Sequence, residues 1–344
     1  MSQPAQPSAA STATAIPLTD PALAARLSER MVVVEQALAE AVASADRLAG
    51  DVARHLMSAG GKRLRPFLTL LAGELGDGTR PELIDAAVVV ELTHLASLYH
   101  DDVMDSAPLR RGAPSVHSVW GNTVAILVGD LLFARASGRV ALLGPEAVRL
   151  QAETFERLCL GQLHETTGPD DHEDPVRHYL QVLADKTASL LSTSARFGAM
   201  FGGAPREAVE IVAAYGEKVG VAFQLADDVL DLASTGATSG KTPGTDLREG
   251  IPTMPVLLLR QRVARGAASP DDADLLAALD GDLSSDVVLA DVVARLQAHD
   301  VLGETRELAV RYAREAAAHL APLPEGPVKE ALDSFATALA DRAA

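Results

Sequence analysis

The feature that most restricts the fold of this chain is a 25-residue stretch, Glu82 to Ser106, that contains neither glycine nor proline. As a helix, this stretch would be roughly 37 Å long at 1.5 Å per residue. No segment of the chain has the period-two alternation, rich in Val, Ile, Thr and aromatic residues, that is typical of strands. We therefore predict an all-α fold: a single-domain bundle of about ten or more helices, with the active site in a central cavity between facing helices.

Apolar residues recur every three or four positions in several other stretches, which predicts further helices. The first is expected to run without a break from Pro21 to Met57. Later helices are expected from about Thr123 to Val140, from Pro145 to His164 and from Arg206 to Leu232.

Two acidic motifs lie at the ends of long apolar runs: Asp-Asp-Val-Met-Asp at 101–105 and Asp-Asp-Val-Leu-Asp at 227–231. Residues four apart share one face of a helix, so Asp101 is expected to pair with Asp105, and Asp227 with Asp231. Mg²⁺ binds carboxylate oxygens and keeps part of its coordination shell for water and substrate phosphate. The two acidic pairs therefore indicate a magnesium-diphosphate site between helices.

A single acidic cluster on a helix is more often a solvated face than a binding site. This motif, however, occurs twice, and the copies begin 126 residues apart (227 − 101). Neither copy has the Asp-x-Asp-x-Asp-Gly pattern of a calcium loop. The repetition therefore favours a functional site over a purely structural one.

Basic residues gather in two turns. The first, Gly60-Gly61-Lys62-Arg63-Leu64-Arg65-Pro66, combines glycines that let backbone N–H groups approach a ligand with three cations, and such a turn suits a phosphate. A plain helix–helix connection with exposed basic residues explains it equally well. The second, Arg110-Arg111-Gly112, closely follows the first acidic motif, and guanidinium groups can bind phosphate oxygens in a fixed fork.

Composition limits the classes of partner and compartment. The net charge of −17 argues against nucleic acid, and it means that an anionic substrate must be bound by local positive charge. Cys159 is the only cysteine, which fits a reducing compartment. No apolar run reaches the roughly 18 to 20 residues of a membrane span. We expect a cytoplasmic protein with a disordered tail, residues 1–20, and one domain, residues 21–344.

Two loops are also of interest. The segment Ser234 to Pro255 is rich in Gly, Ser, Thr and Pro and is expected to form a mobile flap. His164, Asp171 and His172 offer an alternative metal site, but nearby prolines leave no fixed helical spacing and favour a solvated loop. Beyond the flap the chain returns to Ala- and Leu-rich helix, in which we find no chemistry.

These residues together resemble the trans-isoprenyl diphosphate synthases, the polyprenyl synthetase family, and in particular its bacterial medium- and long-chain members. The resemblance runs from about residue 25 to the C-terminus. It rests on seven motifs in order: Gly-Gly-Lys-x-x-Arg-Pro at 60–66, His94 before the first acidic pair, Arg110-Arg111-Gly112, Gly161-Gln162, Lys186-Thr187, Phe223-Gln224 before Asp227-Asp228, and Gly240-Lys241 before Asp246-Leu247.

The resemblance implies a magnesium-dependent prenyltransferase, a homodimer, that condenses isopentenyl diphosphate with an allylic diphosphate to give a linear all-trans polyprenyl diphosphate. Isopentenyl diphosphate would be held by Lys62, Arg65, His94 and Arg111. The allylic diphosphate would be held by Arg110, Lys186, Thr187, Gln224 and Lys241. Magnesium would be bound by Asp101, Asp105 and Asp227, which together with Lys186 are the candidate catalytic residues.

One position departs from the family pattern. Many members have a second lysine after the Glu-Gly at 249–250, and here Ile251 stands in its place, which leaves one contact to the allylic diphosphate in question. Three alternatives stay open: a short-chain (farnesyl or geranylgeranyl) diphosphate synthase, a class I terpene cyclase, and an inert regulatory subunit of a heteromeric synthase. The second acidic motif lacks the mixed Asn, Ser or Thr and Glu ligands typical of a cyclase.

Product length is expected to depend on the helix that carries the first acidic motif. Ala96 and Ser97 lie about one turn before Asp101, and both are small. Short-chain relatives look blocked here by an aromatic ring, so small residues favour an open channel and a product of roughly 30 to 50 carbons, with transient membrane contact on release. Close helix packing is the alternative explanation. The channel would run toward Thr93, Leu92 and Val89, with Phe133 as a candidate floor.

Overall fold

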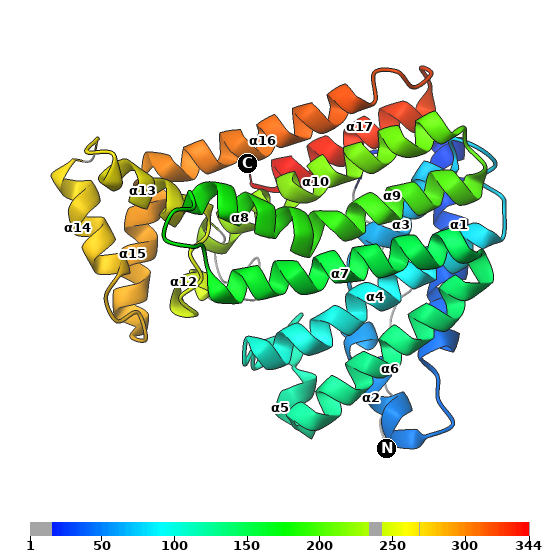
Figure 1. The fold of residues 1–344 in the computed structure, drawn as a ribbon, viewed down its shortest axis with the longest axis horizontal. Helices are drawn as coiled ribbons and strands as arrows, with labels where there is room; N and C mark the ends of the chain where they lie inside the picture. Colours follow the sequence, from blue (N-terminus) through cyan, green and yellow to red (C-terminus); the bar gives the residue numbers. More distant parts are fainter. Residues whose placement is uncertain (1–15, 234–242, 268, 344) are drawn as a thin grey trace.

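The computed structural model describes residues 16–233, 243–267 and 269–343, and most of these residues lie in helices (Figure 1). The predicted all-α fold is confirmed. Residues 1–15 of the predicted tail, and residues 234–242 of the predicted flap with Lys241, lie outside the described residues. Residues 16–20 are described, and Ile16 is buried in the core, so packing begins before the expected boundary.

The first part of the chain forms the larger group of helices. These are α1 (Pro21–Val42), α2 (Arg47–Ser58), α3 (Leu64–Gly73), α4 (Glu82–Met104), α5 (Val116–Trp120), α6 (Asn122–Val140), α7 (Pro145–Thr167), α8 (Pro175–Leu183), α9 (Ser189–Gly202) and α10 (Arg206–Ala233). A short hairpin, β1 (Leu109–Arg110) and β2 (Ala113–Pro114), lies between α4 and α5, and the π-helical segment Ala184–Ala188 joins α8 to α9.

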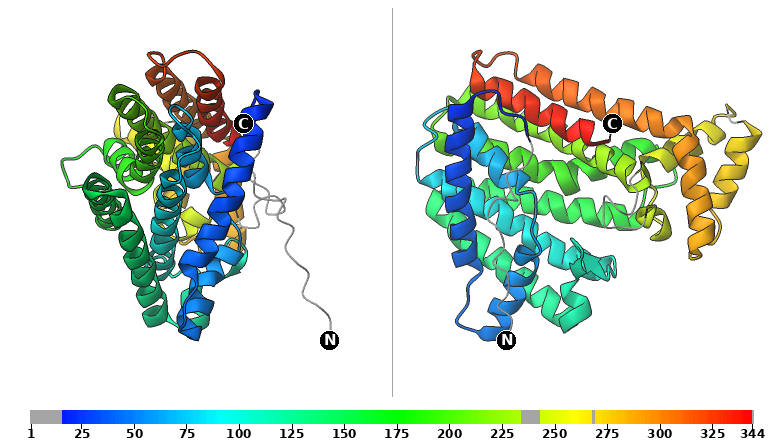
Figure 2. Two further views of the ribbon diagram at one scale, coloured as in Figure 1. Left: turned by 90° about the vertical axis from the view of Figure 1, so that its right-hand side faces the viewer. Right: turned by 180° about the vertical axis from the view of Figure 1, so that it is seen from behind.

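The second part of the chain continues with shorter helices and then returns along the bundle. These are α12 (Thr245–Arg248), α13 (Met254–Ala264), α14 (Pro270–Leu279), α15 (Asp286–Ala298), α16 (Asp300–His319) and α17 (Pro327–Ala340). Helices α13, α14 and α15 lie together at one end of the molecule, and α16 runs back beside α10 (Figures 1 and 2).

Helix α4 is a central element of the bundle. Between Leu83 and Asp102 most of its residues are buried, and α1, α3, α6 and α9 pack around it (Figure 2). A helix that is apolar on all sides must be covered on all sides, which explains why the stretch without glycine or proline lies inside. The structure ends this helix at Met104, close to the predicted end.

Helices α3 and α9 approach each other at the level of their backbones. A Cβ atom added to Gly198 would lie 2.1 Å from the carbonyl oxygen of Thr69, and one added to Gly202 would lie 2.3 Å from that of Gly73. Only glycine permits this distance. The contact fixes α3, whose first residues, Leu64 to Pro66, are the last residues of the basic turn.

The predicted continuous helix from Pro21 to Met57 was wrong, because α1 ends at Val42 and α2 begins at Arg47. The Asp46 side chain accepts a hydrogen bond from the Ala49 N–H at 2.8 Å and so caps a new helix. The chain turns there even though the apolar spacing continues. Among the described residues, no helix is both long enough and apolar enough to cross a membrane.

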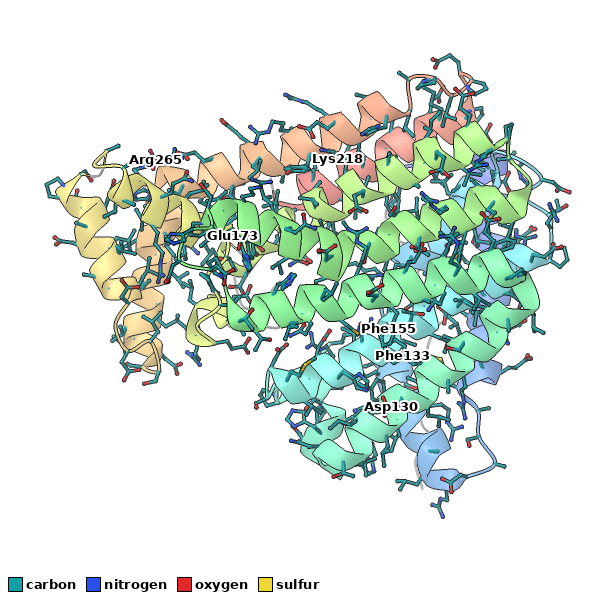
Figure 3. The ribbon with its side chains drawn as sticks, in the orientation of Figure 1. Asp130, Phe133, Phe155, Glu173, Lys218 and Arg265 are labelled. Carbon is teal, nitrogen blue, oxygen red and sulfur yellow. The ribbon has the colours of Figure 1, made fainter. Side chains whose placement is uncertain are left out.

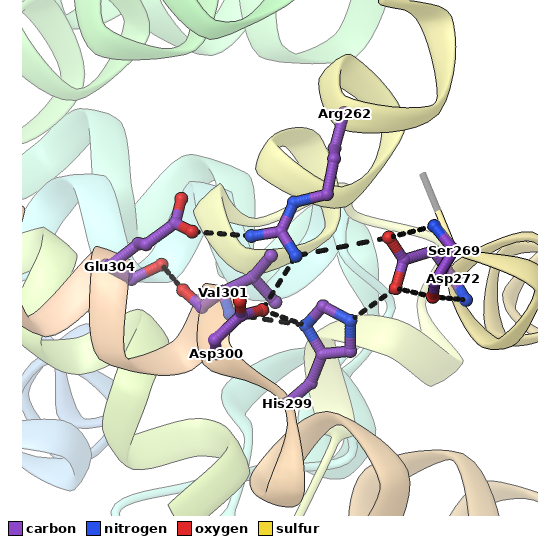
Figure 4. Close-up of polar contacts among 8 residues, drawn as sticks. Arg262, Ser269, Asp272, His299, Asp300, Val301 and Glu304 are labelled. Carbon is purple, nitrogen blue, oxygen red and sulfur yellow. Dashed lines mark hydrogen bonds and ion pairs between the residues drawn. The ribbon is translucent and has the colours of Figure 1, made fainter. Parts of the chain in front are cut away.

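A second hydrophobic core lies among α8, α10 and α13 to α16, and a polar network ties its outer helices together (Figure 4). Arg262 of α13 contacts Asp300 of α16 at 2.8 Å. His299 Nε2 lies 3.0 Å from Asp272 Oδ1, and Asp272 forms a capping box with Ser269 at the start of α14. The network joins the end of α13 to the starts of α14 and α16.

We expect Asp272→Asn to lower the free energy of unfolding at neutral pH. Hydrogen bonds from His299 and Ser269 lower the pKa of Asp272 to about 2, below the ordinary 3.8. A carboxyl with a depressed folded-state pKa contributes stability above its unfolded pKa, and that stability is lost as the pH falls through the folded value. The difference in free energy of unfolding between wild type and variant, measured by urea unfolding, should therefore shrink between about pH 4 and 2. Asp271→Asn, an exposed neighbour, is the control, and a deficit that grows below pH 4 would contradict the account.

Candidate active site

The first acidic motif forms the C-terminal end of α4. Its middle residue, Asp102, is fully buried, and Asp102 Oδ1 accepts a hydrogen bond from Arg110 Nε at 2.6 Å. Asp101 and Asp105 are only half-buried. Asp102 therefore holds the β1–β2 hairpin against α4, and the outer two carboxylates are left for the site.

Asp101 lies in an environment that disfavours its charge. Burial, reinforced by the nearby charge of Asp105, raises the pKa of Asp101 to about 6, although Lys186 and Arg110 oppose the shift. Lys186 is itself ion-paired with Glu165. Burial alone would lower the pKa of Lys186, but Glu165 and Asp101 outweigh it and raise the value. The surroundings of Asp101, Asp105 and Glu165 therefore hold an excess of negative charge, which a bound cation would neutralise.

The second acidic motif lies in the last two turns of α10 and repeats this division of roles. Asp228 is buried, accepts hydrogen bonds from the Tyr179 hydroxyl at 2.9 and 3.0 Å, and accepts another from the Met254 N–H at 3.1 Å. Burial raises the pKa of Asp228 well above its ordinary value. Asp227 is more accessible and contacts Arg342 Nη2 at 3.3 Å.

The basic turn at residues 60–66 is closed by Arg111. The Arg111 guanidinium donates a hydrogen bond to the carbonyl oxygen of Gly60. A Cβ atom on Gly61 would lie 2.9 Å from Arg111 Cζ, and Gly61 has a φ of +155°. The φ of Gly61 favours glycine at this position, and the contact of Arg111 with Gly60 brings two predicted site segments together.

Arg65 of the basic turn lies within the electrostatic influence of both acidic motifs. Burial and the neighbouring charge of Arg111 lower the pKa of Arg65 to about 10, while Glu91, Asp101 and Asp227 act in the opposite direction. Burial and the surrounding arginines also hold the pKa of His94 well below its ordinary value. The charges of both acidic motifs therefore act on the basic turn.

The predicted Lys186-Thr187 motif lies in the π-helical segment Ala184–Ala188, and the wider turn of a π-helix is frequent at functional sites. A Cβ atom on Gly161 of α7 would lie 2.6 Å from the backbone nitrogen of Lys186, so this glycine lets α7 approach the segment. Thr187 Oγ1 donates a hydrogen bond to Gln224 Oε1 at 3.2 Å. The structure therefore brings these predicted residues together.

The donor set fits a hard metal ion only in part. Within the described ranges, no three His, Cys, Asp or Glu side chains already converge on one point. An ion at Asp101, Asp105 or Asp227 would therefore need oxygen atoms from water or a diphosphate, as Mg²⁺ commonly has. Two residues of the alternative metal site considered from the sequence, Asp171 and His172, are exposed, as expected for a solvated loop.

Sequence reasoning missed two arginines. Arg342, in the stretch in which we expected no chemistry, contacts Asp227 and lies over the Phe223 ring at 5.1 Å. No local motif marks Arg342. Arg63, inside the basic turn, is buried and forms ion pairs with two glutamates, Glu35 and Glu91. Its left-handed φ of 49° could not be read from the sequence.

The chain is similar to proteins of one family along nearly its whole length. The family model for polyprenyl synthetases matches residues 46–287. Nonaprenyl diphosphate synthase of Mycobacterium tuberculosis is 43% identical over 318 residues, which are 92% of this chain and 93% of that protein. Heptaprenyl diphosphate synthase component 2 of Geobacillus stearothermophilus is 36% identical and covers 92% of this chain and 97% of its own length.

Solved structures give the same result. The geranylgeranyl pyrophosphate synthase of Corynebacterium glutamicum, crystallised with calcium and isoprenyl diphosphate, matches with a TM-score of 0.83 at 41% identity, over 95% of this chain and 99% of that one. The polyprenyl synthase of Caulobacter crescentus matches with a TM-score of 0.85 at 33% identity, over 94% and 97%. The chain belongs to the polyprenyl synthetase family.

Proposed function

We propose that this protein is a magnesium-dependent prenyltransferase that condenses isopentenyl diphosphate with an allylic diphosphate into a linear all-trans polyprenyl diphosphate. The observation that carries the proposal is the Arg110-Arg111 segment, which contacts the first acidic motif through Asp102 and the basic turn through Gly60. Two diphosphates require cations, and ionisation of one of them requires metal-binding carboxylates. Relatives named nonaprenyl, heptaprenyl and octaprenyl diphosphate synthases support a product of about 30 to 50 carbons.

The allylic diphosphate is proposed to lie at the end of the site that contains Lys186. Thr187 and Gln224, which already share a hydrogen bond, would orient it, with Arg110 and Lys241 as further cations. Mg²⁺ held by Asp101, Asp105 and Asp227 would supply the charge that lets the allylic C–O bond ionise. Lys186 would stabilise the departing diphosphate in the same low-dielectric surroundings.

Isopentenyl diphosphate is proposed to bind at the basic turn, through Lys62, Arg65, Arg111 and neutral His94. An apolar pocket would keep water from quenching the allylic cation. The isopentenyl double bond would attack this cation, and the released diphosphate would accept the final proton. A terpene cyclase needs no second diphosphate site, so the closed turn made by Arg111 and Gly60 favours a synthase. An inert subunit would have no reason to keep both carboxylate sets.

The tail of the growing chain is proposed to run along α4 toward α6. Ala96 is fully buried and Ser97 is half-buried. Phe133 of α6 lies against Phe155 of α7, with ring centroids 4.3 Å apart (Figure 3). This aromatic pair is a candidate floor for the channel.

The protein is further proposed to act as a cytoplasmic homodimer. Helices α6 and α7 expose large apolar side chains, among them Leu127 at 61%, Leu163 at 55% and Phe155 at 37%. An apolar face of this kind is typical of a protein–protein interface, and a second copy would cover it. Analytical ultracentrifugation tests this assembly. The single Cys159 fits the cytoplasm, and contact with a membrane would be needed only transiently, when the product leaves.

Asp101→Ala or Asp227→Ala should lower turnover on the order of 10³-fold or more, about 4 kcal/mol of barrier, because each removes a ligand of the ion that supports ionisation. Asp291→Ala, an exposed carboxylate on α15, is the control. The measurement is product formation from isopentenyl diphosphate, an allylic starter and Mg²⁺, with circular dichroism as the check on the fold. Near-normal turnover of either variant at saturating substrate and Mg²⁺ would refute the assignment. Cyclic hydrocarbon from the wild type would indicate a cyclase.

Lys62→Ala and Arg65→Ala should raise the KM for isopentenyl diphosphate roughly tenfold to a hundredfold, since a charge-assisted hydrogen bond contributes roughly 1.5 to 3 kcal/mol. The KM for the allylic substrate should change little. Arg47→Ala, which removes an arginine whose side chain is 96% exposed, should alter neither constant. If the allylic KM rises instead, the two diphosphate sites have been exchanged.

Ala96→Phe should shorten the main product to roughly 15 to 20 carbons, because the ring would block the channel about one turn from Asp101. Activity on short starters should persist, as the carboxylates are untouched. Reversed-phase chromatography of the dephosphorylated products gives the chain length, and Ala318→Phe on the exposed face of α16 is the control. An unchanged product length, or a wild-type product of 20 carbons or fewer, would count against the channel.

A further inference from the structure

A buried ionic cluster lies beneath the basic turn. Arg63 Nε donates to Glu35 Oε1 of α1 at 2.6 Å, and Arg63 Nη1 donates to Glu91 Oε1 of α4 at 2.9 Å. Arg63 Nη2 also reaches the carbonyl oxygen of Met57 at the end of α2, at 3.4 Å. The side chains of Arg63 and Glu91 are each only 2% exposed. One guanidinium therefore connects the turn to three helices.

The backbone of Arg63 depends on this cluster. Its φ of 49° lies in the left-handed region, which non-glycine residues rarely adopt. Arg63 immediately precedes Leu64, the first residue of α3, and lies between Lys62 and Arg65. The conformation at this residue sets the directions in which the two neighbouring cations leave the backbone. A side chain clamped by two carboxylates keeps that conformation populated.

Glu91 also acts on the cations that surround it. Its second oxygen, Oε2, is buried and has no hydrogen-bond partner. The negative charge of Glu91 favours the protonated forms of both Arg65 and Arg111. His94 lies three residues later on the same helix, so both face the same side. One carboxylate thus binds the Arg63 guanidinium directly and acts electrostatically on Arg65 and Arg111.

We propose that Arg63 and Glu91 are positioning residues for the isopentenyl diphosphate site, which they shape from below without touching the substrate. The donors of Arg63 are already engaged, and its side chain is too buried to reach a ligand. This inference rests on the function proposed above. It assigns to Arg63 a role different from that of the two cations beside it in the same turn.

The charge of Glu91 allows positioning to be separated from simple electrostatics. Removing a negative charge beside three arginines would tighten the binding of an anion if the effect were only electrostatic. If Glu91 positions the arginines, Glu91→Gln should instead weaken binding, because the guanidinium groups lose the group that orders them. We expect the KM for isopentenyl diphosphate to rise by about tenfold, with the allylic KM and kcat within about twofold.

Two further variants complete the kinetic test. Glu35→Gln removes the other, half-exposed partner of Arg63 and should change the isopentenyl KM by less than about threefold. In the Glu91→Gln background, Arg65→Ala should cost much less than it does in the wild type, because residues that act through one another are not additive. Tighter binding by Glu91→Gln, equal changes in both KM values, or full additivity would overturn the proposal.

Direct binding keeps this test independent of the proposed reaction. Inorganic diphosphate is titrated calorimetrically into the metal-free wild type and variants, and Glu91→Gln should weaken its binding by about tenfold. A wild type that binds diphosphate but makes no prenyl product would refute the proposed function, and weaker diphosphate binding by Glu91→Gln would still identify Arg63 and Glu91 as positioning residues of a diphosphate site. If Glu91→Gln does not fold, Arg63→Lys carries the test. Lysine keeps the charge but cannot bridge both glutamates, and unchanged diphosphate binding by this folded variant would overturn the inference.

Discussion

The site depends on ion pairs that hold several of its cations against carboxylates of the protein. Glu91 faces the arginines of the basic turn, Asp102 holds Arg110, and Glu165 holds Lys186. Ion pairs of this kind contribute little net stability, because desolvation offsets much of the attraction. Their effect is geometric: each fixes a cation where a mobile side chain would otherwise turn toward water. The fold can therefore keep several cations close together before any diphosphate neutralises them.

Each acidic motif has three carboxylates, and the fold itself uses one of them. In both motifs the middle aspartate is buried and bound by the protein: Asp102 by Arg110, and Asp228 by Tyr179 and the Met254 N–H. On a helix the middle residue lies about 100° from its predecessor, so it points into the bundle when the outer pair points out. The buried middle aspartate thereby fixes the rotation of each helix end about its axis, and we propose that this directs the outer carboxylates toward the site.

The helical pattern allowed much of this to be predicted from the sequence. The long apolar stretch became α4, and the glycine-rich, basic and acidic motifs converged because they occupy helix ends and turns. The break between α1 and α2 was not predictable, since the apolar spacing continues through it and a single cap at Asp46 decides the outcome. Arg342 was also beyond reach, because its contact with Asp227 joins residues 115 apart, 342 − 227, through tertiary packing alone.

Ile251 shows how packing and charge combine at the edge of the site. This residue, where the resemblance led us to expect a lysine, lines a cavity of about 450 Å³ together with Tyr179, Pro252 and Leu257. Tyr179 is the residue whose hydroxyl holds Asp228. The same lining also contains Glu165, Asp174 and Arg260, so the cavity is not purely apolar. Ile251 adds an uncharged side chain to the lining that Tyr179 shares, so no charge at position 251 competes with the Tyr179 hydroxyl for Asp228.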